Sequence, residues 1–118
     1  MIHVPTNILL VDDEKDFVEM LSMRLEDAGD KVTPAYDGKM CLDCLDTNGI
    51  DVVILDIKMP GMDGKQVLEI LKKEHKHIEV IILTGHGSVD SAVDCTKLGA
   101  FAYLPKPYEL EKLLDTLQ

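Results

Sequence analysis

Short runs of consecutive apolar residues constrain the fold of this chain more than any other feature. Four such runs occupy residues 8–11, 52–55, 80–83 and 101–104. Continuous apolar runs, as opposed to alternating ones, are typical of strands buried on both faces, as in a parallel sheet that helices cover on both sides. A polar side chain follows each run directly or within two residues. The pattern therefore predicts a parallel sheet whose strands end in groups that can bind a ligand.

Segments with helical periodicity follow the predicted strands. They cover residues 14–28, 39–46, 64–76, 88–98 and 109–117. In the first of them, Phe17, Leu21 and Leu25 recur every four residues, which places three apolar side chains on one helix face. Gly29 and Gly99 follow the first and fourth of these segments, and glycine is a common terminator of helices. The repeated order of strand and helix predicts an α/β sandwich with right-handed crossovers.

The segment 31–36 predicts a further strand of a different kind. It is short and contains Pro34, which has no backbone N–H to donate to a neighbouring strand, so we expect it at an edge of the sheet. This agrees with the flavodoxin-like strand order 2-1-3-4-5, in which strands 1, 3 and 4 are central. We therefore predict a flavodoxin-like (βα)5 sandwich of three layers. At 118 residues the chain has the length of one domain, which we expect to cover residues 1–118.

The composition excludes several classes of function. With 12 basic and 22 acidic side chains the formal net charge is −10, so the surface should repel nucleic acid and anionic membranes. No apolar stretch approaches the roughly 20 residues of a membrane span, and the N-terminus lacks a signal-peptide pattern, so we expect a cytoplasmic domain. Cys41 and Cys44 form a C-x-x-C pattern, but no second pair stands at zinc-binding spacing. Ordinary helix thiols are the favoured interpretation.

Acidic residues directly follow two of the apolar runs. Asp12 and Asp13 come after 8–11, and Asp56 comes after 52–55. Ligands of such sheets bind beyond the carboxyl ends of the strands, where these carboxylates would meet and repel one another unless a cation lay among them. Mg²⁺ prefers oxygen ligands of this kind. Taken alone, Asp12 and Asp13 could equally form a turn and a helix cap, and Asp56 could be a loop acid. Their joint occurrence favours a metal site.

Groups that suit a phosphate follow the other two runs. Thr84 and Lys106 would supply a hydroxyl donor and a positive charge at the same edge of the sheet. Gly85 leaves its backbone N–H open to a ligand because it has no side chain. Lys106 lies between two prolines, and the bond from Lys106 to Pro107 is a candidate for the cis form. The sequence thus predicts a phosphate site beside the cation site.

These motifs together resemble the receiver domain of two-component response regulators, and the resemblance covers nearly the whole chain. In order, they are Asp12-Asp13-Glu14, Leu55-Asp56-Ile57-Lys58-Met59-Pro60-Gly61-Met62-Asp63-Gly64, Thr84-Gly85 and Lys106-Pro107. The stretches 83–88 and 97–100 are similar to the receivers of nitrogen-regulator-type transcription activators. The resemblance implies that Asp56 accepts a phosphoryl group from a sensor histidine kinase or a phosphotransfer protein.

The same resemblance implies a role for the acids around Asp56. Asp13, Asp56 and the backbone carbonyl of Lys58 would bind Mg²⁺, and Asp12 would act mainly through water. The cofactor expected is therefore Mg²⁺, held by carboxylate and carbonyl oxygens, which agrees with the chemistry of the residues themselves.

The resemblance further implies a phosphate-binding set and a switch. Thr84, Lys106 and the backbone amides of Lys58 and Gly85 would hold the phosphoryl oxygens. Tyr103 would be an aromatic residue that turns inward as Thr84 moves toward the phosphate, although an ordinary half-buried aromatic is the alternative. The switching surface would comprise the fourth helix, the fifth strand and the fifth helix. An output domain in the same chain and a homodimer through that surface are left open.

Two other classes of protein compete with this interpretation. Phosphatases related to the haloacid dehalogenases also place a nucleophilic aspartate after an apolar strand, but they carry a second aspartate two positions later, where this chain has Lys58. A flavin-binding module would need a Ser-, Thr- and Gly-rich loop after the first strand, and Asp12 and Asp13 there would repel a phosphate. We therefore expect a regulatory phosphoacceptor domain and not an enzyme.

Overall fold

The computed structural model describes residues 5–45, 49–57, 61, 63–85 and 89–105. In this part of the chain strands and helices alternate, with bounds β1 Asn7–Val11, α1 Lys15–Asp27, β2 Lys31–Ala35, α2 Gly38–Leu45, β3 Val52–Leu55, α3 Gly64–Glu74, β4 Glu79–Thr84, α4 Val89–Lys97 and β5 Ala102–Pro105. The predicted strands and the first four predicted helices are confirmed. The predicted helix over 109–117 and the bond from Lys106 to Pro107 lie outside the described residues.

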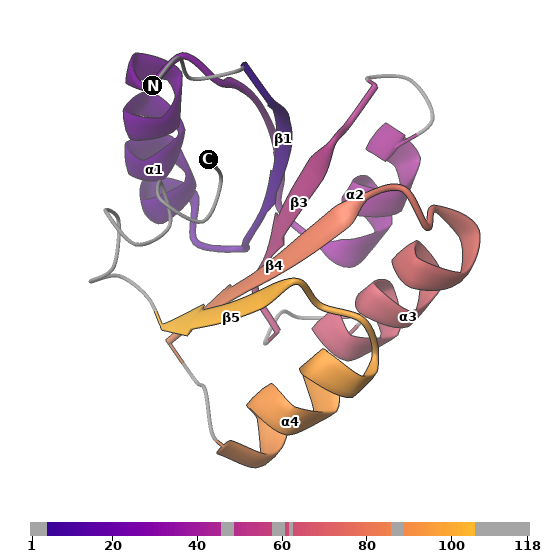
Figure 1. The fold of residues 1–118 in the computed structure, drawn as a ribbon. Helices are drawn as coiled ribbons and strands as arrows, with labels where there is room; N and C mark the ends of the chain where they lie inside the picture. Colours follow the sequence, from indigo (N-terminus) through magenta and orange to yellow (C-terminus); the bar gives the residue numbers. More distant parts are fainter. Residues whose placement is uncertain (1–4, 46–48, 58–60, 62, 86–88, 106–118) are drawn as a thin grey trace.

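The strands form one parallel sheet in the order β2-β1-β3-β4-β5. Every pair of neighbouring strands runs in the same direction, so each connection must cross over the sheet. Figure 1 shows α1 on one face of the sheet and α2 and α3 on the other. The predicted flavodoxin-like order and its three layers are therefore confirmed.

Two apolar clusters, one on each face of the sheet, form the core. One contains inward-facing side chains of α1, namely Val18, Leu21 and Leu25, and Phe17 packs against it. The other joins the sheet to the opposite helices, with Leu68 and Leu71 of α3 and Cys95 of α4 among its buried members. The four-residue spacing in α1 thus placed its apolar face correctly.

Burial along the strands follows their position in the sheet. In β1, β3 and β4, every residue after the first is buried. Strand β2 lies at an edge, as Pro34 predicts, and its residues are mostly exposed or half-buried. The expectation that all four apolar runs form doubly buried strands is wrong for the last one, because Phe101 is 61% exposed. Strand β5 starts one residue later and has a partner strand on one side only.

Left-handed glycines follow two of the helices, as predicted. Gly29 has φ 100° after α1 and Gly99 has φ 105° after α4, conformations that residues with a Cβ atom rarely adopt. The backbone N–H groups of Gly29 and Gly99 donate to the carbonyls of Glu26 and Thr96, which satisfies acceptors at the ends of the two helices. The chain can therefore turn directly into β2 and toward β5.

The cysteines behave as ordinary helix thiols. Cys41 and Cys95 are buried, Cys44 is half-buried, and no disulfide joins these cysteines in the structure described. Burial, and to a smaller extent the nearby Cys44, raises the pKa of the Cys41 thiol to about 12. No described helix combines the length and apolar character that crossing a membrane requires.

Candidate functional site

The pairing of three strands brings Asp12 and Asp56 together. Val11 and Leu55, the residues before them, lie side by side in the β1–β3 register. The backbone N–H of Asp56 donates to the carbonyl of Val11 at 3.0 Å, which continues the ladder one residue beyond β3. The N–H of Asp12 likewise donates to the carbonyl of Ala35 in β2 at 3.0 Å. Both acids are therefore fixed by backbone hydrogen bonds at the carboxyl end of the sheet.

Asp12, Asp13 and Asp56 form an acidic cluster at this edge. Each offers a carboxylate oxygen, and these atoms all lie within 4.8 Å of one another. Asp12 and Asp56 are 1% and 2% exposed, whereas Asp13 is exposed to solvent. Within the described ranges this is the one group of three or more acidic, histidine or cysteine side chains that could hold a metal ion. The predicted convergence of the three acids is confirmed.

The turn that was the alternative for Asp12 is also present. One carboxylate oxygen of Asp12 accepts the backbone N–H of Glu14 at 3.0 Å, and α1 begins at the next residue. Glu14 at the N-cap makes no side-chain capping bond. Asp12 therefore serves both the turn and the cluster, because a carboxylate has two oxygen atoms with several acceptor positions.

The electrostatics of the cluster favour a cation. Charged oxygens within 4.8 Å of one another repel by on the order of 3 kcal/mol per pair at an effective dielectric constant of about 20. A hard divalent ion relieves this repulsion, since it prefers several oxygen ligands and retains water on its open side. The donor set therefore fits Mg²⁺ or Ca²⁺, with exposed Asp13 on the side of solvent.

Thr84 is the last residue of β4, the strand that pairs with β3, which Asp56 follows. The β3–β4 register pairs Leu55 with Ile82, so Thr84 extends beyond the end of β3. Thr84 is 1% exposed, and Gly85 after it is exposed. The β4–β5 register pairs Thr84 with Pro105, the residue that precedes Lys106. Lys58 and Lys106 lie outside the described residues, so their predicted roles stay predictions.

Tyr103 faces the core on the side of α3 and α4. It pairs with Ile82 in the β4–β5 register and packs against the cluster that contains Leu68 and Cys95. Its hydroxyl oxygen is buried and has no hydrogen-bond partner among the residues that the structure describes. The hydroxyl therefore points inward although the residue as a whole is half-buried, and the switch role and the ordinary half-buried aromatic both stay predictions.

The start of α3 closes the loop that follows Asp56, a feature that sequence reasoning missed. The backbone N–H of Gly64 donates to the carbonyl of Ile57 at 2.9 Å, which joins the two ends of the loop. Asp63 caps α3 by accepting the N–H of Lys65 at 2.8 Å, and the side chain of Gln66 accepts the N–H of Asp63 at 3.1 Å. Asp63 followed three residues later by Gln66 is the signal that would have predicted this capping box.

The fold and the acidic cluster together define an α/β domain with a candidate divalent-cation site, and the family follows from comparison. Residues 8–118 match the response regulator receiver domain, and the chain belongs to that family. The haloacid-dehalogenase-like alternative therefore has no support. The relatives are regulators of transcription of the nitrogen-regulator type, which confirms the subfamily suggested by the sequence.

Two relatives illustrate the extent of the similarity. The transcriptional regulatory protein GlrR of Escherichia coli is 38% identical over 117 residues, which is 99% of this chain and 26% of that protein. The DNA-binding transcriptional regulator NtrC of Klebsiella pneumoniae is 41% identical over 103 residues, 87% of this chain and 22% of that protein. This chain thus spans about a quarter of the length of these curated relatives.

A solved structure of a response regulator from Burkholderia pseudomallei has the same fold. It is 28% identical, with a TM-score of 0.88, and the match covers 96% of this chain and 66% of that one. That protein was crystallised with a phosphorylated aspartic acid, a calcium ion and citrate. A protein with this fold therefore contains both a phosphorylated aspartic acid and a divalent ion in its crystal structure.

Proposed function

We propose that this domain is the phosphoacceptor of a two-component phosphorelay, and that Asp56 receives the phosphoryl group. The observation that carries the proposal is the acidic cluster, in which Asp56 stands at the end of a central strand with its carboxylate beside those of Asp12 and Asp13. The donor is the phosphohistidine of a sensor histidine kinase or of a phosphotransfer protein. The domain proposed covers residues 1–118 and acts as a regulated acceptor, not as an enzyme with its own substrate.

The reaction proposed is an in-line displacement at phosphorus. A carboxylate oxygen of Asp56 forms the new O–P bond while the P–N bond of the phosphohistidine breaks, which leaves an acyl phosphate and a free imidazole. The backbone hydrogen bond from Asp56 to Val11 holds the nucleophile on a rigid strand, so little reorganisation precedes the attack. Asp12 and Asp13 place two further carboxylates beside that of Asp56.

The divalent ion proposed for the cluster is Mg²⁺. Asp13, Asp56 and the backbone carbonyl of Lys58 would hold it directly, and Asp12 through water. When bound, the ion neutralises charge on the carboxylates and on the phosphoryl oxygens. The oxygen-only donor set supports this assignment, as does the calcium ion held by the related Burkholderia protein.

The remaining residues would bind the phosphoryl group and transmit its presence. Thr84, Lys106 and the backbone amides of Lys58 and Gly85 would hold its oxygens. To change the ratio of active to inactive conformations from 1:99 to 99:1, the phosphoryl group must stabilise the active conformation by about 5.5 kcal/mol more than the inactive one. A few charge-assisted hydrogen bonds of about 1.5–3 kcal/mol each supply that amount. Inward-turned Tyr103 would register the change on the surface formed by α4, β5 and the following helix.

The context proposed for the domain follows from its relatives. Regulators of transcription of about four times its length carry similar receivers, so we propose an output domain in the same chain. DNA contact would then belong to that output domain, since this chain has a net charge of −10. A homodimer through the α4–β5 surface is a further part of the proposal. Three cysteines that form no disulfide with one another in the structure described fit a reducing compartment, and we propose the cytoplasm.

Phosphorylation by a small donor tests the proposal directly. We expect incubation with acetyl phosphate and Mg²⁺ to add one phosphoryl group, detected by intact mass spectrometry. The Asp56→Asn variant and a sample treated with a chelator should gain nothing. Asp43→Asn, which removes an exposed acid from α2, is the matched control and should be labelled like the unmodified protein. Labelling that survives in Asp56→Asn contradicts the assignment.

A further inference from the structure

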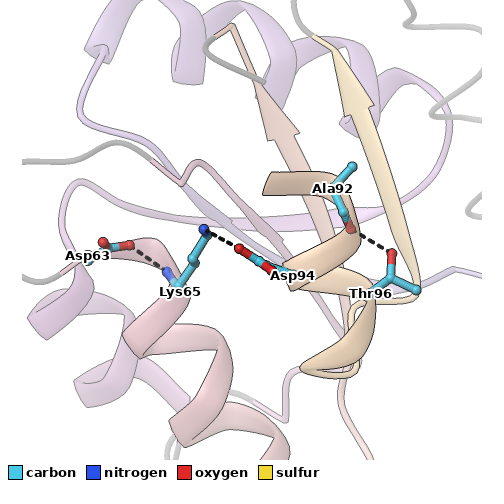
Figure 2. Close-up of polar contacts among 5 residues, drawn as sticks. All are labelled: Asp63, Lys65, Ala92, Asp94 and Thr96. Carbon is cyan, nitrogen blue, oxygen red and sulfur yellow. Dashed lines mark hydrogen bonds and ion pairs between the residues drawn. The ribbon is translucent and has the colours of Figure 1, made fainter. Parts of the chain in front are cut away.

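An ion pair joins the two helices that follow the strands of the site. The ammonium of Lys65 in α3 lies 3.2 Å from a carboxylate oxygen of Asp94 in α4 and donates a hydrogen bond to it. Figure 2 shows Lys65 and Asp94 directed toward each other across the gap between the helices. This contact raises the pKa of the Lys65 ammonium, chiefly through the hydrogen bond that Lys65 donates to Asp94. The two helices are thereby linked by charge.

On the α3 side, this link is anchored to the strand that carries Asp56. Gly64, adjacent to Lys65, donates to the carbonyl of Ile57 at 2.9 Å. Its Cα faces the backbone of Ile57 so closely that a Cβ atom would lie 2.5 Å from the Ile57 Cα atom. Because Ile57 directly follows Asp56, the first turn of α3 is held against the residue next to the proposed phosphoacceptor.

On the α4 side, the C-terminal end of the helix is held by packing against α3, and the middle of the helix is held by the ion pair. A Cβ atom on Gly99 would lie 3.1 Å from the Cγ atom of Lys72 in α3. Lys72 is itself held by a 3.0 Å hydrogen bond to the carbonyl of Ile78. Lys65 and Asp94 have 33% and 58% of their side-chain surface exposed, so their contact can break without opening the core. Of these two contacts between α3 and α4, the ion pair is therefore the one that can form and break while the fold stays intact.

We propose that Lys65 is a positioning residue which, through Asp94, holds α4 where inward-turned Tyr103 can be accommodated, and so favours the phosphorylated form. This inference rests on the proposed functions of Asp56 as phosphoacceptor and of Tyr103 as switch residue. Tyr103 packs against the core cluster that contains Cys95, the residue after Asp94, so the position of α4 affects the space that the tyrosine side chain occupies. An interaction that stabilises one of two states raises the affinity of that state's ligand by the same factor.

The size of the effect is limited by solvent. Exposed ion pairs contribute little because water and salt screen them. We therefore expect a change in ligand affinity of about 1.5- to fivefold when the pair is removed. An effect of this size tunes a switch and does not by itself operate it.

The experiment measures binding of beryllofluoride, a phosphoryl mimic, by calorimetry in the presence of Mg²⁺. Asp94→Asn and Lys65→Gln should each weaken binding by about 1.5- to fivefold. Lys65→Arg keeps the positive charge and should bind nearly as the unmodified protein does. The double exchange Lys65→Glu with Asp94→Lys restores a pair of opposite charges and should recover most of the loss. Lys73→Gln removes an exposed charge from the same helix and serves as the matched control.

The outcomes separate this inference from the proposed function. Affinity that is unchanged or higher in both Asp94→Asn and Lys65→Gln overturns the inference while the unmodified protein still binds the mimic. Single-variant losses that the double exchange fails to recover also overturn it. An unmodified, folded protein that binds no beryllofluoride overturns the proposed function itself. Hydrogen exchange at the amides of α4 provides a second readout, with faster exchange expected in both single variants.

Discussion

Gly64 packs against Ile57 with no room for a side chain between them. A Cβ atom at Gly64 would lie 2.5 Å from the Cα atom of Ile57 and 2.7 Å from the carbonyl oxygen of Asp56. The atoms in the way belong to the backbone, which cannot rotate aside as a flexible side chain can. The contact explains why glycine stands at the first position of α3, where a residue with higher helix propensity would otherwise be preferred.

Substitution of Gly64 by alanine should therefore destabilise the domain. We expect Gly64→Ala to lower the free energy of unfolding by about 2–3 kcal/mol, because the first turn of α3 must shift away from β3. Urea denaturation measures this change through the midpoint at constant slope. Phosphorylation by acetyl phosphate should slow as well, since the shift disturbs the residue next to Asp56.

Gly61 provides the comparison for this substitution. It has φ 82° and no described residue within 4 Å of an added Cβ atom, so Gly61→Ala introduces conformational strain without a collision with that part of the chain. We expect a loss of about 1–2 kcal/mol for that variant. A smaller loss for Gly64→Ala than for Gly61→Ala would show that the contact with Ile57 is not the limiting one.

The capping box of α3 can be tested by removing the side chain of Asp63. Asp63→Ala leaves the N–H of Lys65 without its 2.8 Å acceptor at the N-terminus of the helix. We expect a loss of about 0.5–2 kcal/mol in the free energy of unfolding, measured by urea denaturation. Asp63→Asn keeps an acceptor oxygen and should recover most of this loss. Equal losses in the two variants would show that charge, and not capping, is responsible.

Neutralisation of Asp13 should have opposite effects without and with metal. In a chelator, Asp13→Asn should raise the free energy of unfolding by on the order of 1 kcal/mol, because it removes repulsion from the acidic cluster at an exposed position. With Mg²⁺ added, the stabilisation that the ion gives the unmodified protein should shrink. Loss of a direct ligand should weaken Mg²⁺ binding at least about tenfold, since changes to outer-shell groups alone cost about 10–100-fold.

Thermal unfolding with and without Mg²⁺ measures both effects of Asp13→Asn. Asp16→Asn removes another acid from the first turn of α1 and is the control. The assignment of Asp13 as a metal ligand fails if Mg²⁺ raises the melting temperature of Asp13→Asn as much as that of the unmodified protein.

The buried thiol of Cys41 should make stability fall at alkaline pH. Its pKa is about 12 in the folded protein, whereas a thiol in the unfolded chain has a pKa of about 8.5. Between these values the unfolded state releases a proton that the folded state retains. Stability present below the lower value is therefore lost as pH rises toward the higher one, by up to about 1.4 kcal/mol per pH unit.

Comparison of variants isolates this contribution from other groups that titrate at high pH. Cys41→Ala should show a shallower fall in the free energy of unfolding between pH 8.5 and pH 10.5, although about 1–2 kcal/mol of packing is lost at every pH. Cys44→Ala, at the half-buried position on the same helix, should keep most of the steep fall. Parallel slopes for Cys41→Ala and the unmodified protein would show that this thiol does not titrate as described.

The sequence was informative where short-range rules apply. Pro34 predicted an edge strand because proline lacks a donor, and Gly29 predicted a helix end because it tolerates positive φ. The convergence of Asp12, Asp13 and Asp56 followed from strand order, since parallel strands bring their carboxyl ends to one edge.

Contacts that depend on how helices pack were beyond the sequence. Lys65 and Asp94 are 29 residues apart, and each has many oppositely charged residues as alternatives in a chain of this composition. The exposure of Phe101 was mispredicted because an apolar run does not reveal at which residue the strand begins. Asp12 illustrates a third limit, because its turn and its place in the cluster were treated as alternatives although one carboxylate serves both.

Because every strand runs in the same direction, one rim of the sheet holds only the carboxyl ends of strands and the other holds only the amino ends. The two rims therefore present different residues. The reactive groups gather where strands finish, while Asn7, Lys31 and Ile50 line the rim where strands begin. Strand β1 has five residues, which at about 3.3 Å per residue separates the rims by roughly 16 Å. A fluorophore or surface tether at exposed Lys31 would thus lie too far from a bound phosphoryl group at the opposite edge to contact it.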